Sequence, residues 1–330
     1  MHYAVQAFSG KLFAGGNFGE QFSSFNSGYM SIFWTFIVMV CTCAVIIKGV
    51  SSGIEKFNKI LIPGMLILLL VLMIRALTLP GAGEGASFFL RPDFSKLSAE
   101  AALVALGHAF FSLSLGMGTM ITYGSYVERK QSLGAATFAI GFGDLLYAFI
   151  AGLIIFPTTY SFGIDAEQGP GLVFVALPAA FSAMPFGSLF GGLFFILLSI
   201  AALTSTVSLL EVPVAFTMER WGWSRQKSAI ILAAIIFLIS IPSLLSLGLV
   251  PDLKIANQGF FDFVDFVASN ILLPLGGLTV TIFVGHFWKN AADEAGVSSF
   301  WLRIWLFMLR YIAPILIVLI FLNSSGILTF

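Results

Sequence analysis

The sequence predicts an all-α protein that crosses a membrane several times, and three observations support this fold class. Apolar residues make up 58% of the 330 residues and charged residues only 10%, whereas a soluble domain carries about 25% charged residues. Apolar runs recur that are long enough to cross a hydrocarbon core of ~30 Å as helices. Acidic and basic residues balance at 16 each, which excludes the strong positive charge typical of nucleic-acid-binding proteins. We therefore expect a lipid bilayer, and no nucleic acid, as a partner.

Eight spanning segments are predicted from the apolar runs and the turn-forming residues between them. They cover residues 31–49, 60–79, 102–126, 134–160, 188–218, 227–248, 262–287 and 304–323. Residues 14–30 are rich in Gly, Ser and Asn and are predicted to form an external loop, and residues 79–85 (LPGAGEG) a turn. The apolar residues 172–178 are too few to span, so we expect a short helix packed on the outer surface.

Basic residues set the predicted orientation of these spans. Ten lysines and arginines fall in one set of loops and five in the other, and cytoplasmic loops carry the excess of positive charge. The richer set includes residues 51–59, 127–133 and 219–226, which are therefore predicted to face the cytoplasm. The first complete span then runs from the outside to the inside.

The third predicted span contains a stretch, residues 107–127 (GHAFFSLSLGMGTMITYGSYV), that is a poor continuous helix. Glycine, serine and threonine crowd its centre, and each glycine costs ~1 kcal/mol relative to alanine inside a helix. A helix broken at membrane depth leaves peptide groups unpaired, which is tolerated only where they line a cavity or bind a ligand. Small residues also let membrane helices pack closely. Residue content alone leaves both interpretations open.

Polar residues inside two other spans are candidate binding residues. Asp144 lies ten residues after Gly134, about 15 Å along a helix, where a charge costs at least ~2.5 kcal/mol and should face a polar interior or a cation. The alternative is a structural aspartate bonded to neighbouring hydroxyls. The hydroxyls of Thr204 and Ser205 either bond carbonyls of their own helix or serve a site. Glu211 has no evident partner and is interpreted as structural.

The order of residues in the broken stretch resembles the sixth transmembrane helix of the neurotransmitter:sodium symporter family, the LeuT-type sodium-coupled amino-acid transporters. The matching residues are 110–118 (FFSLSLGMG) and 121–126 (ITYGSY), and the similarity extends from residues 48–56 (KGVSSGIEK) to 310–314 (RYIAP). The resemblance implies a partial LeuT-type inverted-repeat fold with eight complete helices, one of them interrupted, matching family helices four to eleven.

The same resemblance implies that residues 1–330 form a single transmembrane transporter domain. This domain would lack the first two family helices and most of the third, so residues 1–13 would match only the outer end of the third helix. On this interpretation the chain begins inside a helix, and it belongs to an incomplete transporter.

Two sodium sites, each incomplete in this chain, are also implied by the resemblance. The first sodium would be held by the hydroxyl of Ser112 and by Asp144, which stands where the family has an asparagine or, in some bacterial members, an aspartate. The second would be held by the carbonyl of Ala201 and the hydroxyls of Thr204 and Ser205. Hard oxygen ligands suit sodium, and no set of Cys or His residues indicates a transition metal.

The amino-acid substrate would meet a third set of residues implied by the resemblance. These are Phe111, Ser112, Ser114, Met117, Ser205 and Leu209. The ammonium group would contact the carbonyls of Phe111 and Ser112 and the hydroxyl of Ser114, while Met117 and Leu209 would line an apolar pocket. The ring of Phe111 would cover the site. Asp265, which matches an acid that pairs with an arginine of the first family helix, would belong with Phe111 to the outer gate.

Three functions are therefore open. The leading one is sodium-coupled symport of amino acids, hydrophobic ones above all, by a multi-pass protein of the plasma membrane, which in bacteria is the inner membrane; no enzymatic activity is expected. The second is an unrelated ion transporter or channel that uses the same broken helix. The third is a non-transporting remnant or membrane scaffold. No feature of the sequence indicates an oligomeric state.

Overall fold

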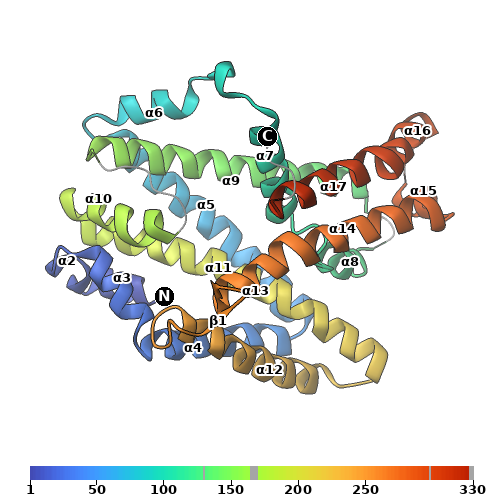
Figure 1. The fold of residues 1–330 in the computed structure, drawn as a ribbon, viewed down its shortest axis with the longest axis horizontal. Coiled ribbons are helices and arrows are strands. Elements are labelled where there is room, and N and C mark those ends of the chain that lie inside the picture. Colours follow the sequence, from blue (N-terminus) through green and yellow to red (C-terminus); the bar gives the residue numbers. More distant parts are fainter. Residues whose placement is uncertain (129–130, 164–169, 297–298, 327–330) are drawn as a thin grey trace. The chain divides into compact units, whose positions relative to one another are not determined.

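The computed structural model describes residues 1–128, 131–163, 170–296 and 299–326 and is almost entirely helical (Figure 1). Within these ranges, seven continuous helices are long and apolar enough to span a membrane. The strands β1 (Lys254–Ile255) and β2 (Gln258–Gly259) form a small antiparallel hairpin. The chain divides into two compact units, Met1–Pro92 with Leu146–Phe261, and Asp93–Leu145 with Asp262–Phe330.

In the first unit the long helix α11 (Gly187–Trp221) is the central element. It packs against α1, α4, α5, α10 and α12, and α4 also lies along α12, as Figure 1 shows. The helices of this unit are α1 (His2–Phe8), α2 (Lys11–Ala14), α3 (Phe18–Asn26), α4 (Met30–Ile47), η1 (Val50–Glu55), α5 (Lys56–Leu77), α6 (Ala82–Leu90), η3 (Leu172–Ala176), α10 (Leu177–Ala183), α11 and α12 (Arg225–Ser246). The helix α9 (Leu133–Ser161) belongs to both units, because the division falls between Leu145 and Leu146.

The buried core of the first unit lies where α1, α5, α9, α10 and α11 meet. Tyr3 on α1 is 5% exposed, and its ring lies 5.0 Å from that of Phe174 and 5.1 Å from that of Phe195. Leu12 and Leu177 are completely buried in the same cluster. The apolar character of residues 1–13 is thus explained by packing on α11.

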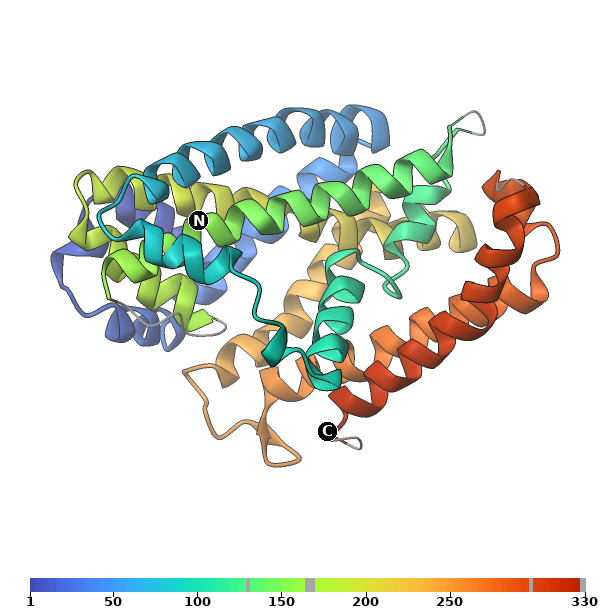
Figure 2. The ribbon, with the colours of Figure 1, turned by 90° about the horizontal axis from the view of Figure 1, so that it is seen from above.

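In the second unit α14 (Leu273–Ile282) packs against α17 (Ala313–Ser324), which also contacts α7. Figure 2 shows the chain between α7 and α8 as a turn that interrupts the helix. The elements of this unit are η2 (Phe94–Lys96), α7 (Ala99–Ser112), α8 (Thr119–Gly124), the first part of α9, α13 (Phe260–Phe266), η4 (Val267–Leu272), α14, η5 (Phe283–Phe287), α15 (Ala291–Ala295), α16 (Ser299–Phe307), η6 (Met308–Ile312) and α17. The chain passes between the units at three points: between Pro92 and Asp93, within α9 and within α13.

The predicted spans agree with the structure. Seven coincide with the continuous helices to within a few residues, except that the second begins at Val50, ten residues before its predicted start at residue 60. The third predicted span is interrupted, as its glycine and serine content indicated. The apolar segment 172–178 lies in the short helices η3 and α10, as predicted.

Two segments predicted as a loop and a turn are helical in part. Residues 14–30 contain the helix α3, which begins where the side chain of Asn17 accepts a hydrogen bond from the N–H of Glu20, 3.2 Å away. The asparagine counted as a loop residue is therefore a helix cap. Residues 79–85 contain the start of α6, where a Cβ on Gly85 would lie 2.3 Å from the carbonyl oxygen of Phe156. The glycine permits close packing of α6 on α9. From the sequence alone, a glycine required for such packing cannot be distinguished from a glycine that forms a turn.

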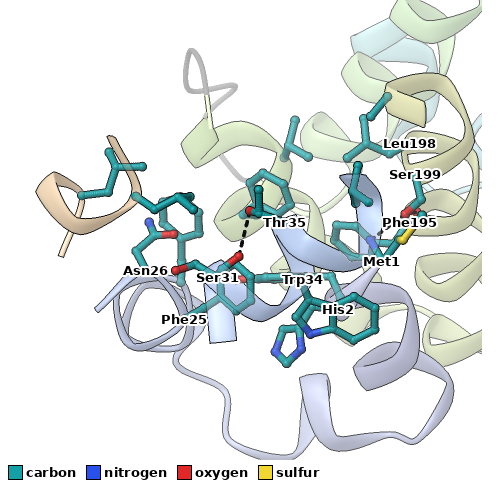
Figure 3. Close-up of a pocket in the computed structure, with 18 residues that line it drawn as sticks. Met1, His2, Phe25, Asn26, Ser31, Trp34, Thr35, Phe195, Leu198 and Ser199 are labelled. Atoms are coloured by element: carbon teal, nitrogen blue, oxygen red, sulfur yellow. Dashed lines mark hydrogen bonds between the residues drawn. The ribbon is translucent and has the colours of Figure 1, made fainter. Parts of the chain in front are cut away.

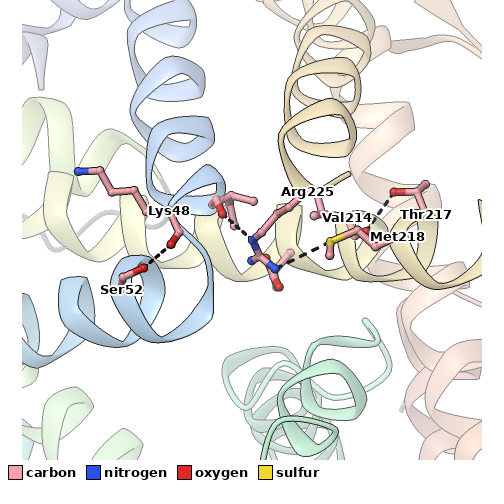
Figure 4. Close-up of polar contacts among 8 residues, drawn as sticks. Lys48, Ser52, Val214, Thr217, Met218 and Arg225 are labelled. Carbon is pink, nitrogen blue, oxygen red and sulfur yellow. Dashed lines mark hydrogen bonds and ion pairs between the residues drawn. The ribbon is translucent and has the colours of Figure 1, made fainter. Parts of the chain in front are cut away.

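Glu211 has a partner that the sequence did not reveal. Its side chain is completely buried, and its carboxylate lies 2.5 Å from Nη2 of Arg225, the first residue of α12. Arg225 also donates from Nε to the carbonyl of Ile46, 2.7 Å away in the last turn of α4, and Nη1 points toward Sδ of Met218 (Figure 4). One guanidinium therefore links the ends of α4, α11 and α12.

Removing this guanidinium should destabilise the first unit. Arg225→Met removes one partner of a buried ion pair with Glu211, a change that typically costs ~3–5 kcal/mol. The melting temperature in detergent should fall by several degrees, and Glu211→Met in the same protein should restore most of the loss, because an apolar pair replaces a buried ion pair at little cost.

The matched control is Arg220→Met, which removes an exposed arginine from the last turn of α11, the helix that carries Glu211. Its melting temperature should stay within about 2 °C of the parent, since surface substitutions are usually small in effect. A parent-like melting temperature for Arg225→Met would show that the pair does not stabilise the fold.

Candidate functional site

The interruption between α7 and α8 is a tight turn with three residues in the left-handed region of backbone conformation. Ser114 has φ +54°, and Gly116 and Gly118 both have φ +80°. The N–H of Ser114 donates to the carbonyl of Phe111 (2.9 Å), and the N–H of Leu115 to the carbonyl of Phe110 (3.0 Å). These bonds close the end of α7, and among the described residues no backbone hydrogen bond outside the regular helices ends on the carbonyl of Ser112.

Gly116 fits this turn for two reasons. Its positive φ is costly for any residue with a Cβ, and a Cβ there would lie 2.3 Å from the carbonyl oxygen of Leu273 and 3.0 Å from the nitrogen of Gly277. On the opposite side, a Cβ on Gly276 would lie 2.3 Å from the carbonyl oxygen of Gly116. The turn therefore packs directly on the backbone of α14. Close packing and helix interruption, left open as alternatives by the sequence, are both present.

Gly276 and Gly277 are site residues that the sequence argument missed. A Cβ on Gly277 would lie 2.1 Å from Cζ of Phe110, so this glycine makes room for the last turn of α7. The available signal was a pair of adjacent glycines inside the seventh predicted span. Nothing in that pair indicated which helix approaches it.

The hydroxyl of Ser112 donates to Oδ1 of Asp144 over 2.5 Å, within the second unit. Ser112 is the last residue of α7, and Asp144 lies eleven residues after the start of α9, about 16 Å along the helix. Hydrogen bonds to a carboxylate are short and strong. The structure thus brings together the two side chains predicted for the first sodium, and it also satisfies the alternative of an aspartate bonded to a neighbouring hydroxyl.

On α11 of the first unit, the three oxygens predicted for the second sodium lie together. The carbonyl of Ala201 accepts from Oγ1 of Thr204 (2.8 Å) and from Oγ of Ser205 (3.2 Å). These are the intrahelical bonds expected of hydroxyls in an apolar helix. The arrangement puts three hard oxygens on one face of one helix.

The remaining predicted residues are distributed over both units. Phe111 is exposed and Met117 half-buried beside the turn, while Leu209 is exposed on α11. Asp265 is exposed in α13, and its Oδ1 accepts from the hydroxyl of Ser269 over 3.2 Å. Ser112, Ser114, Asp144 and Asp265 belong to the second unit, and Ala201, Thr204 and Ser205 to the first.

A cavity of about 560 Å³ in the first unit is a separate feature (Figure 3). Aromatic side chains from α1, α3 and α4, including Tyr3, Phe25 and Trp34, line it together with Ser199 of α11. His2 stacks on Phe25 with ring centroids 4.7 Å apart. None of the residues predicted to bind sodium or substrate lines this cavity.

The broken helix, the Ser112–Asp144 contact and the oxygens on α11 occur in a chain whose residues 21–328 match the model of the sodium:neurotransmitter symporter family. The chain belongs to this family. The family comprises sodium-coupled transporters and not enzymes. Together with seven candidate membrane-spanning helices among the described residues, membership identifies a multi-pass protein of the plasma membrane.

Relatives cover nearly all of this chain but are longer than it. The sodium-dependent transporter YhdH of Bacillus subtilis is 35% identical over 337 residues, which cover 99% of this chain and 75% of YhdH. A sodium-dependent transporter of Haemophilus influenzae is 37% identical over 303 residues, which cover 91% of this chain and 66% of the relative. The chain thus spans about two thirds to three quarters of the length of these proteins.

A solved structure of the same fold supports the architecture. MhsT, crystallised in complex with L-phenylalanine, superposes with a TM-score of 0.88 at 43% identity over 98% of this chain and 75% of MhsT. The fold is therefore that of a LeuT-type transporter, in agreement with the sequence prediction.

Gly116→Ala should disrupt the interrupted helix of this symporter chain. The positive φ costs an alanine roughly 1–2 kcal/mol, and the backbone of α14 at Leu273 leaves no room for the added methyl group. We expect a lower yield of folded protein and a melting temperature reduced by at least about 4 °C.

Gly141→Ala is the matched control, because Gly141 lies within α9 and a Cβ there meets no atom within 4 Å. This variant should be neutral or slightly more stable, since alanine is the better helix former by ~1 kcal/mol. Equal behaviour of the two alanine variants would contradict the close approach of Gly116 to α14.

Proposed function

We propose that the protein containing this chain is a sodium-coupled symporter of hydrophobic amino acids. The observation that carries this proposal is the hydrogen bond from Ser112, at the end of the broken helix, to Asp144 at membrane depth. A carboxylate and a hydroxyl beside an opened backbone offer hard oxygen ligands to a small cation. Transporters of this kind use broken helices to bind ions and charged substrate groups.

Two sodium sites are part of this proposal. The second unit would supply Ser112 and Asp144 to the first site, and α11 of the first unit would supply Ala201, Thr204 and Ser205 to the second. Support for the second site comes from the three oxygens on one face of α11. Each set is too small to complete the coordination of a sodium ion, so further ligands would come from other parts of the transporter.

The substrate contacts follow the same division. In the second unit the carbonyls of Phe111 and Ser112 and the hydroxyl of Ser114 would receive the ammonium group, and Met117 would line the side-chain pocket. The carbonyl of Ser112 supports this assignment. Among the described residues, it accepts no backbone hydrogen bond outside the regular helices. Leu209 and Ser205 of α11 are the contribution of the first unit.

Further parts of the proposal concern the domain and its gate. We infer that residues 1–330 belong to a single transporter domain that matches family helices four to eleven. Phe111 would cover the bound substrate. Asp265, exposed at the start of the seventh span, would belong to the outer gate.

Competition experiments test the substrate class. Met117 and Leu209 offer an apolar surface, and methionine adapts its shape to different ligands. Sodium-dependent binding of radiolabelled L-phenylalanine to the full-length protein should therefore be displaced by leucine or methionine at concentrations at least about ten-fold lower than by glutamate or lysine, a difference of ~1.4 kcal/mol. Stronger competition by the charged amino acids would refute the assignment.

Asp144→Asn tests the first sodium site in the same protein. Asparagine keeps an oxygen ligand but removes the negative charge that would balance sodium in a low-dielectric cavity. Because residue 148, one turn later, is the neutral Ala148, Asp144 would be the permanent counter-charge and binding should not require chloride. The sodium concentration for half-maximal substrate binding should rise on the order of ten-fold in the variant.

Asp262→Asn is the control, since it removes an exposed carboxylate from the first turn of α13. It should leave the sodium dependence unchanged in chloride-free buffer. If Asp144→Asn binds sodium and substrate as tightly as the parent there, Asp144 is a structural residue and the first site is misplaced.

A further inference from the structure

A pair of threonine hydroxyls joins α4 to α11 inside the first unit. Oγ1 of Thr42 lies 2.8 Å from Oγ1 of Thr206, and Thr42 is only 1% exposed. Each hydroxyl also lies close to a carbonyl of its own helix, Thr42 to that of Val38 (2.8 Å) and Thr206 to that of Leu203 (2.9 Å). Thr206 directly follows Thr204 and Ser205 in the sequence, whereas Thr42 lies on α4.

The number of protons limits these three contacts. Each hydroxyl carries one hydrogen, so two hydrogens serve three short contacts. If Thr42 donates to Thr206, Thr206 still donates to Leu203, and the carbonyl of Val38 keeps only its ordinary helical partner. If Thr206 donates to Thr42, Thr42 still donates to Val38, and the carbonyl of Leu203 keeps only its ordinary helical partner. In both cases the bond between the helices forms without leaving either threonine hydroxyl unpaired, so it carries no desolvation cost from an unpaired hydroxyl.

The position of Thr206 around α11 gives this bond its consequence. At 3.6 residues per turn, Ala201, Thr204 and Ser205 share one face, and Thr206 lies about 140° away from the centre of that face. A bond on nearly the opposite side of the helix restrains its rotation about its own axis. Rotation is the motion that would carry the three oxygens away from a bound ion.

We propose that Thr42 is a positioning residue for the sodium ligands on α11, acting through its hydrogen bond to Thr206. The inference rests on the proposed second sodium site and adds to it a residue on another helix. Ion sites depend on ligands held within a few tenths of an ångström, and side chains that do not touch the ion commonly provide this restraint. Thr42 touches none of the proposed ligands and acts only on the helix that carries them.

Sodium-dependent thermal stabilisation of the full-length protein tests the proposal without any substrate. The probe is sodium gluconate, used in place of sodium chloride and titrated at constant ionic strength. The readout is the sodium concentration that gives half of the maximal shift in melting temperature. Thr42→Val removes the hydroxyl at nearly constant volume and should raise this midpoint about three-fold, the effect of one average hydrogen bond between membrane helices. Thr42→Ser keeps the hydroxyl and should restore the parent midpoint.

The matched control is Thr35→Val on the same helix. Oγ1 of Thr35 donates to the carbonyl of Ser31 over 2.8 Å, a bond at the start of α4. This variant should leave the midpoint unchanged. The double variant Thr42→Val with Thr206→Val should have the midpoint of Thr206→Val alone, because both single changes remove the same bond.

The outcomes separate the inference from the function on which it rests. A lower melting temperature without sodium, combined with a parent-like sodium midpoint in Thr42→Val, shows a purely structural role and overturns the inference alone. A parent protein that gains no stability from sodium overturns the proposed sodium sites and this inference with them. A midpoint raised in Thr42→Val, restored in Thr42→Ser and unchanged in Thr35→Val supports it.

Discussion

Peptide groups in hydrocarbon must find hydrogen-bond partners inside the protein, and this constraint organises the whole chain. Seven continuous helices among the described residues meet it internally. The interruption between α7 and α8 meets it differently, because Ser114 and Gly116 adopt left-handed conformations that return two N–H groups to the end of α7. The backbone of α14 then covers the turn at Gly276 and Gly277. At the end of α7 the carbonyl of Ser112 accepts none of the backbone bonds that close this turn, and the hydroxyl of Ser112 donates to Asp144.

A second restraint acts on α11, which carries the other group of candidate ligands. Arg225 holds the C-terminal part of this helix through the buried Glu211, and Thr42 contacts Thr206 about one and a half turns earlier. Both contacts come from helices that pack along α11, and both involve polar groups that an apolar surround makes costly to separate. The helix proposed to offer hydroxyls to an ion is therefore held at two points along its length by polar bonds as well as by apolar packing.

The sequence predicted the spans and the interruption, because long apolar runs and clustered glycines are strong local patterns. The placing of Ser112 beside Asp144 came from the family resemblance, with the charge inside a span as the local signal for Asp144. Asn17 and Gly85 misled the prediction, since a cap residue and a close-packing glycine have the same identity as loop residues. The partner of Glu211 was also missed. Arg225 lies fourteen residues later and beyond the end of α11, so only the fold of the α11–α12 turn brings the two charges together.

The two proposed sodium sites differ in how much they must rearrange. In the first, Ser112 gives its hydrogen to Asp144, and its lone pairs stay free for a cation while that bond persists. In the second, Thr204 and Ser205 both direct their hydrogens to the carbonyl of Ala201, which is itself a proposed ligand. A cation there must displace those hydrogens before the three oxygens can face it. The first pair would meet an ion with its oxygens already oriented. In the second site the hydroxyls of Thr204 and Ser205 would first have to rotate away from the carbonyl of Ala201, and the bond between Thr42 and Thr206 would hold α11 in place while they do so.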